Sequence, residues 1–124
     1  MNETGAATDP TDPGVEQSRC CEAVAHSLTE TELAADLRIL TAAGSETRYE
    51  VLRLVAAADG GVCVCELEPS LGVSQGAISQ ALSRLYTAGL VSRRKEGRWR
   101  YYTATPRAQR LLELLDDIRT QNNE

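Results

Sequence analysis

The chain has 124 residues, of which 42% are hydrophobic and none is phenylalanine, so it fits one domain with a modest aliphatic core. Its formal net charge of −5 by itself argues against a nucleic-acid partner. No apolar run approaches the roughly 18 residues of a membrane span, so we expect a cytoplasmic protein without membrane contact, whose four cysteines stay reduced.

The N-terminal region lacks the periodicity of a folded element. Residues 1–15 are rich in Pro, Gly, Thr and acidic side chains, a composition that predicts a disordered acidic tail. Residues 16–120 are expected to form one domain. Its first part, residues 16–28, has a weakly helical pattern and holds the adjacent pair Cys20 and Cys21.

Two helices are predicted next. Thr29, followed three residues later by Glu32, is a capping box that starts a helix, and Gly44 ends it. The apolar face of this helix consists of leucines at helical spacing: Leu33, Leu37 and Leu40. Ser45 caps a second helix, which ends at the turn of residues 59–61.

A short helix, a glycine turn and a longer helix follow in the centre of the chain. Residues 62–65 are a short β-prone run, residues 66–71 predict the short helix, and Gly72 breaks it. Ser74 caps the longer helix, which completes a helix-turn-helix. The outer face of the longer helix carries polar side chains that can contact base edges or phosphates: Ser74, Gln75, Ser79, Gln80, Ser83 and Arg84.

A strongly basic β-hairpin comes next. Residues 90–94 and 98–103 predict two strands, joined by a turn at residues 95–97. Side chains alternate along a strand, so Trp99 lies opposite the arginines, and we expect it to pack inward. The arginines of the hairpin that we expect to contact DNA are Arg94, Arg98 and Arg100.

Charge is unevenly distributed along the chain. Residues 74–110 contain eight basic side chains and one acidic one, a net charge of +7, so the remaining residues carry −12. A basic segment in an acidic chain indicates one surface that meets a polyanion. The basic set is twelve Arg and one Lys, a Lys-poor composition typical either of adaptation to high salt or of GC-rich coding.

Pro106 begins a last helix, whose apolar stripe is Leu111, Leu112, Leu114, Leu115 and Ile118. The predicted fold is therefore mostly α with a small β-hairpin wing (α+β): a winged helix-turn-helix that binds double-stranded DNA. An enzyme is the least expected class, because the chain has no C-x-x-C motif, no phosphate loop, and a single histidine, His26, without evident catalytic partners.

Five segments form a combined pattern: Val62-Cys63-Val64-Cys65-Glu66-Leu67, Leu71-Gly72-Val73-Ser74-Gln75, Ile78-Ser79-Gln80-Ala81-Leu82, Leu85-Tyr86-Thr87-Ala88-Gly89-Leu90-Val91 and Arg93-Arg94-Lys95-Glu96-Gly97-Arg98-Trp99-Arg100-Tyr101-Tyr102. The pattern closely resembles the ArsR/SmtB family of metal-sensing repressors, over about residues 29–118. The resemblance implies a homodimer formed through the first and last helices. It also implies a protein that binds its operator without a cofactor and releases it when a thiophilic ion binds.

Two departures from the family pattern limit what carries over. Relatives often end the adenine-reading segment with a His pair, whereas this chain has Gln80 and Ala81, so the operator sequence is not implied. Some relatives sense zinc through His and carboxylates on the last helix. Here that helix has Asp116 and Asp117 but no His, so the zinc site is not carried over.

The four cysteines fall into two pairs, Cys20-Cys21 and Cys63-x-Cys65. Thiolates select soft ions, whereas a buried cysteine can also serve as a small apolar side chain. The resemblance implies that Cys63 and Cys65 bind the effector, and Cys20 and Cys21 are the candidates for the third ligand. Three thiolates suit trivalent arsenic or antimony, which we rank first as effectors, ahead of cadmium, lead or zinc.

The spacing of the second pair predicts a link between ion binding and helix geometry. Residues i and i+2 of an α-helix point about 200° apart, so Cys63 and Cys65 should grip one ion only if the start of the short helix unwinds. Unwinding would re-aim the following helix and lower DNA affinity. The nearby helix N-terminus is expected to lower the pKa of these thiols.

Two other interpretations remain open from the residues. The Cys-x-Cys pair can instead sense oxidants or reactive sulfur by forming disulfide or polysulfide links, a response that strong reductant would abolish. Alternatively, the winged helix is a protein-interaction module with a structural zinc on four thiols. Removing that zinc would unfold the module, whereas a sensor binds DNA in its ion-free form.

Overall fold

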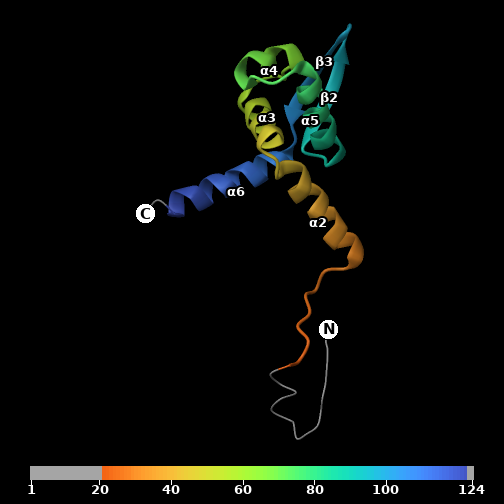
Figure 1. Ribbon diagram of the computed structural model, residues 1–124, viewed down its shortest axis with the longest axis vertical. Helices are drawn as coiled ribbons and strands as arrows, with labels where there is room; N and C mark the ends of the chain where they lie inside the picture. Colours follow the sequence, from red (N-terminus) through yellow and green to blue (C-terminus); the bar gives the residue numbers. More distant parts are fainter. Residues whose placement is uncertain (1–20, 123–124) are drawn as a thin grey trace, which may run out of the picture.

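The computed structural model describes residues 21–122, which form five helices and a two-stranded hairpin (Figure 1). In chain order the elements are α2 (Glu30–Ala43), α3 (Glu46–Ala57), α4 (Val64–Leu71), α5 (Gln75–Thr87), β2 (Val91–Glu96), β3 (Trp99–Ala104) and α6 (Pro106–Asn122). This order confirms the predicted winged helix-turn-helix. Within residues 21–122, no helix combines the length and the apolar character needed to cross a membrane.

The N-terminal predictions are only partly covered by the described residues. The tail predicted for residues 1–15 lies outside them, and so does Cys20. Residues 21–29 contain no helix, so the helical pattern predicted for residues 16–28 is wrong over the part that is described. The first helix of the described residues, α2, begins after Thr29, at the predicted cap.

Side-chain caps set the starts of the helices. Thr29 and Glu32 form the predicted capping box, in which each side chain accepts the backbone N–H of the other residue, at 3.1 and 2.9 Å. Ser45 and Ser74 cap α3 and α5 by accepting the backbone N–H three residues further on. The bend of the helix-turn-helix lies at Gly72, whose φ of 69° is left-handed and suits glycine.

The core lies between α3, α5 and the wing. Tyr102 of β3 faces this core and exchanges two backbone hydrogen bonds with Val62, of 3.0 and 2.8 Å. This bridge places the start of α4 beside the wing. The large side chains that are fully buried are all aliphatic, in a chain without phenylalanine: Leu52, Ile78, Leu82, Leu85, Leu90, Val51, Val55 and Val91.

The wing is an antiparallel pair of strands in which Arg93 lies opposite Tyr102. Its turn consists of Gly97 and Arg98, not residues 95–97 as predicted, because β2 continues through Glu96. Gly97 has a φ of +62°, a conformation that glycine adopts without strain at the start of a two-residue hairpin turn. The turn thus starts two residues later and ends one residue later than expected.

The face of the wing that packs on the core carries Tyr102 and not Trp99. Tyr102 is 6% exposed, whereas Trp99 is 52% exposed. Side chains three residues apart on a strand point to opposite faces, so only one of these two aromatic rings can reach the core. The prediction that Trp99 packs inward is therefore wrong.

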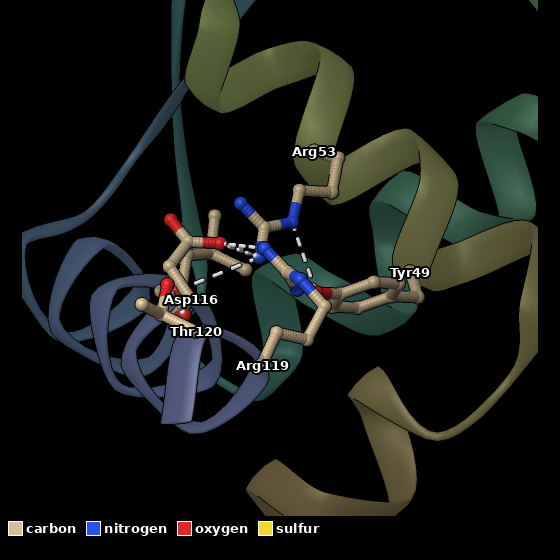
Figure 2. A network of polar contacts seen from close by, with 6 residues as sticks. Tyr49, Arg53, Asp116, Arg119 and Thr120 are labelled. Atoms are coloured by element: carbon tan, nitrogen blue, oxygen red, sulfur yellow. Dashed lines mark hydrogen bonds and ion pairs between the residues drawn. The ribbon is translucent and has the colours of Figure 1, made fainter. Parts of the chain in front are cut away.

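Two arms, α2 and α6, extend away from the core (Figure 1). Figure 2 shows the polar network that joins α6 to α3: Arg53 donates to the Asp116 carboxylate at 2.8 Å, and Arg119 pairs with the same carboxylate. The Tyr49 hydroxyl accepts a further hydrogen bond from Arg53 at 2.9 Å. Both arms keep large apolar side chains exposed: Leu33, Leu37 and Leu40 on α2, and Leu114 and Ile118 on α6.

Candidate DNA-binding surface and thiol site

The exposed face of α5 carries every polar residue that the sequence assigned to it. The apolar residues of the helix, Ile78, Ala81, Leu82 and Leu85, are buried in the core. Helical periodicity therefore turns the remaining side chains outward, where they are free to meet a DNA groove. These exposed residues are Ser74, Gln75, Ser79, Gln80, Ser83 and Arg84.

Two of these residues also hold the helix-turn-helix together. The Ser74 hydroxyl accepts the Ala77 N–H at 3.1 Å and caps α5. The Gln75 amide donates to the Glu68 carboxylate of α4 at 2.9 Å, so its position depends on the preceding helix. Sequence reasoning missed Glu68, because this contact forms only when the two helices pack.

The wing arginines divide into two groups. Arg98 and Arg100 are exposed and make no hydrogen bond or ion pair with another residue of the part described, so both guanidinium groups are available to phosphates. Arg94 is instead held within the protein: it pairs with Glu96 at 2.9 Å and donates to the Gly60 carbonyl at 3.1 Å. Arg94 therefore braces the wing against the loop before α4.

Arg93 contributes a contact that was not expected from the sequence. Its guanidinium lies over the Tyr86 ring, 4.0 Å from the centroid, and this cation–π contact ties β2 to α5. The wing and the reading helix are thus connected by side chains as well as by the core.

The two central thiols meet at the N-terminus of α4. Cys63 is the N-cap residue with extended backbone (φ −104°, ψ 168°), and Cys65 is the second residue of the helix. Their Sγ atoms lie 2.8 Å apart, with Cys63 buried and Cys65 exposed. The expectation that the pair meets only after unwinding is wrong, because α4 begins at Val64 and leaves Cys63 outside the helix.

Glu66 supports this thiol pair, and the sequence analysis did not single it out. Its carboxylate accepts the Cys63 N–H at 3.0 Å, the contact of a capping box with Cys in the place of Ser or Thr. The pKa of the Cys65 thiol is raised, above all by its hydrogen bond with Cys63; desolvation and then the charges of Cys63 and Glu66 act in the same direction. The prediction of a lowered thiol pKa is thus wrong for Cys65, although the residue is exposed overall.

A cavity of about 530 Å³ joins the thiols to the DNA-binding elements. Cys63 and Cys65 form one wall, at the start of α4. The other walls come from α5, with Gln75, Ser79 and Ser83, and from the wing, with Arg93, Trp99, Arg100 and Tyr102. A group bound to the thiols would therefore lie against both elements that are expected to contact DNA.

Within residues 21–122, the structure brings no third ligand to this pair. Cys21 is exposed in the segment before α2, and Figure 1 places that segment at the opposite end of the molecule from α4. Among residues 21–122, no group of three or more His, Cys, Asp or Glu side chains is arranged to hold a metal ion. Cys20 lies outside the described residues.

An exposed polar helix after a glycine turn, flanked by a basic two-stranded wing, defines a winged helix-turn-helix DNA-binding protein. A family described as "Bacterial regulatory protein, arsR family" matches residues 45–93, from α3 into β2. A relative from Halobacterium salinarum, named as the arsenical resistance operon repressor ArsR2, is 57% identical over 112 residues, which are 90% of this chain and 94% of the relative. The chain belongs to the ArsR family.

Solved structures of similar proteins share the fold. HlyU from Vibrio cholerae N16961 is 33% identical with a TM-score of 0.63, and the match covers 73% of this chain and 97% of the HlyU chain. The homodimeric winged helix-turn-helix DNA-binding domain Mb0332 from Mycobacterium bovis is 25% identical with a TM-score of 0.68, covering 82% and 94%. Fold and family confirm the predicted class, a DNA-binding transcriptional regulator rather than an enzyme.

Proposed function

We propose that this protein is a homodimeric repressor that leaves its operator when trivalent arsenic or antimony binds Cys63 and Cys65. The observation that carries the proposal is the shared cavity, in which the two thiols face Gln75 and Arg100. The relative from Halobacterium salinarum is named as an arsenical resistance operon repressor, which supports arsenic as the effector. DNA binding itself needs no cofactor.

The chemistry of the thiol pair favours arsenite over divalent ions at neutral pH. Arsenous acid exchanges one hydroxyl group for each thiol, and the thiol proton leaves with that hydroxyl as water, so no proton is released to solvent. Cadmium, lead and zinc bind thiolates and must release the thiol protons. Because a divalent ion must displace these protons and trivalent arsenic does not, divalent ions rank as weaker effectors at neutral pH.

Ion binding at this site would displace the start of α4 without unwinding it. Two sulfurs bound to one ion at about 2.3 Å are held roughly 3.3 to 3.8 Å apart, depending on the geometry. The two Sγ atoms lie 2.8 Å apart without an ion, so we propose that coordination repositions the two thiols and, with them, the start of α4. The Gln75 amide of α5 is hydrogen-bonded to the Glu68 carboxylate of α4. A shift of α4 would therefore be transmitted to the reading face of α5.

Cys20 or Cys21 is proposed to supply the third thiolate. The segment before α2, to which Cys21 belongs, lies at the far end of α2 from the core and α4 (Figure 1). Donation within one chain therefore requires the N-terminal segment to fold back, and the second subunit of the proposed dimer is the other possible source of the third thiolate. The exposed leucines of α2 and α6 provide the surface for that dimer, and the similar domain Mb0332 is described as homodimeric.

The proposal is tested by DNA release. Fluorescence anisotropy would follow reduced protein on a labelled duplex from upstream of its own gene, with arsenite titrated in a phosphine reductant that does not bind arsenic. We expect loss of the complex at about one arsenic per subunit, and release by cadmium and zinc only at higher concentration. Cys63→Ser and Cys65→Ser should each bind DNA normally and stay bound in arsenite.

Two results would contradict the proposal. Normal arsenite release by Cys63→Ser would refute the thiol site. Release by an oxidant alone, suppressed by the phosphine, would identify a redox sensor of the same fold. As a matched comparison, the double variant Cys20→Ser/Cys21→Ser should still be released, but only at higher arsenite, because two thiolates remain.

A further inference from the structure

A second groove, of about 550 Å³, runs between α2 and the last turns of α5. Its polar lining consists of Arg38 and Thr41 from α2 and of Ser83, Arg84 and Thr87 from α5. No acidic side chain of the described residues lines it. Two guanidinium groups with nearby hydroxyl groups are the donor set that binds phosphate oxygens.

Both arginines are free to take a ligand. Arg38 and Arg84 are exposed, and the guanidinium group of neither makes a hydrogen bond or ion pair with another residue in the described part of the chain. The arginines with structural roles differ in this respect: Arg48 donates to the carbonyls of Ala42 and Thr41, and Arg53 pairs with Asp116. The groove thus presents unused positive charge.

The groove continues the DNA-binding surface across α5. Ser83 lines both this groove and the thiol cavity, so the two hollows meet at that residue of the reading helix. Arg93 and Arg100 of the wing border the cavity on one side of Ser83, and Arg84 and Arg38 border the groove on the other. Basic side chains therefore flank α5 on both sides.

The geometry of a DNA duplex indicates which groups would contact the basic side chains on the two sides of α5. A helix in the major groove, which is about 12 Å wide, has one phosphate backbone on each side. If the wing side of α5 meets one strand, the α2 side meets the other. The groove lies where phosphates of that second strand pass the C-terminal half of the reading helix.

We propose that Arg38 and Arg84 together bind a backbone phosphate of the operator, so that the DNA footprint of each subunit includes α2. The inference rests on the DNA-binding function and adds a contact that the helix-turn-helix and wing do not supply. A phosphate contact carries no base information. Arg38 therefore contributes to affinity and register, not to the choice of sequence.

The test compares Arg38→Gln with the native protein on operator and on random duplex, by anisotropy between 0.1 and 0.4 M KCl. Losing one phosphate contact should lower the salt slope by about 0.9, which amounts to a difference of about 3.5-fold in affinity between 0.1 and 0.4 M KCl. Both duplexes should lose affinity equally, leaving their ratio unchanged. Arg84→Gln should reproduce this loss, whereas Arg38→Lys should retain the native salt slope.

Arg110→Gln is the matched control, since Arg110 is exposed on α6, lines neither hollow, and carries the same charge change. It should bind as the native protein does, and sedimentation should show one oligomeric state for all variants. If Arg38→Gln keeps the native affinity and salt slope while the native protein binds DNA, the phosphate site is wrong. If the native protein binds no duplex at all, the DNA-binding function fails as well.

Discussion

Cys63 and Cys65 meet because they lie on either side of a helix boundary. Cys63 caps α4 with extended backbone, and Cys65 is already helical, so their Sγ atoms approach to 2.8 Å. Inside a helix the same two residues would point about 200° apart. The boundary thus makes a dithiol from residues two apart, and the hydrogen bond between the thiols is the largest cause of the raised Cys65 pKa.

Removing Cys63 should make Cys65 more acidic. In Cys63→Ala the hydrogen bond that favours the protonated Cys65 thiol is lost, so its pKa should fall towards the ordinary value. The measurement is the rate of Cys65 alkylation by iodoacetamide against pH, followed by peptide mass spectrometry. The midpoint should move to lower pH, with Cys21 in the same sample as an internal standard; an unmoved midpoint would remove the proposed cause.

Side chains whose placement follows from one element were predictable from the sequence. The outward face of α5 is such a case, because helical spacing alone separates Gln75 and Ser79 from the buried residues. Side chains placed by contacts between elements were not predictable. Arg94 was expected on DNA, but its guanidinium bonds the carbonyl of Gly60, a residue 34 positions earlier in the chain.

At the scale of elements, the start of α4 shows how a cap can escape notice. The predicted helix began at Glu66, but the structure begins it at Val64, two residues earlier. The signal was present in the sequence as Cys63 followed by Glu66, which has the spacing of a capping box. The capping box was not recognised in the sequence because a cysteine takes the place of the usual Ser or Thr. The geometry of the thiol pair, which depends on this cap, was therefore not predicted.

The attachment of α6 depends on Asp116, whose carboxylate joins Arg53 of α3 (Figure 2). In Asp116→Asn this ion pair is lost, so hydrogen exchange should quicken in the second half of α6 while the thermal unfolding midpoint changes little. Asp117→Asn is the matched control, because Asp117 makes no ion pair with another residue between 21 and 122. Equal exchange in both variants would show that the network does not hold the arm.

Acid should loosen the same arm in the native protein. The hydrogen bond from Arg53, with a smaller contribution from Arg119, lowers the pKa of Asp116. A lowered carboxyl pKa stabilises the folded form above the ordinary Asp value of about 3.9. That contribution disappears as the pH falls through the lowered pKa, so the protection of α6 amides, corrected for the intrinsic pH dependence of exchange, should be constant between pH 5 and 8 and should fall in more acidic solution.

At the scale of the whole molecule, charge and apolar surface are assigned to different regions. Residues 74–110 carry +7 and the remainder −12, so the basic wing and α5 are set within an acidic chain. The two arms, α2 and α6, carry exposed leucines. On α2 the two kinds of surface meet, since Leu37 lines the groove that also holds Arg38. The arm is therefore placed to connect a partner subunit with DNA.

The exposed leucines should determine the oligomeric state. Leu40 is 61% exposed on α2 and Leu114 is 56% exposed on α6, so replacing both with Glu leaves the monomer core intact and puts charge into the proposed interface. Sedimentation should show a dimer for the native protein and a monomer for Leu40→Glu/Leu114→Glu, with unchanged helical circular dichroism. Operator affinity should fall by about 100-fold or more, because the two subunits are no longer linked and each must bind its half-site independently. Ala35→Glu, an exposed change on the opposite side of α2, should remain dimeric; a native protein that sediments as a monomer would contradict the proposed dimer.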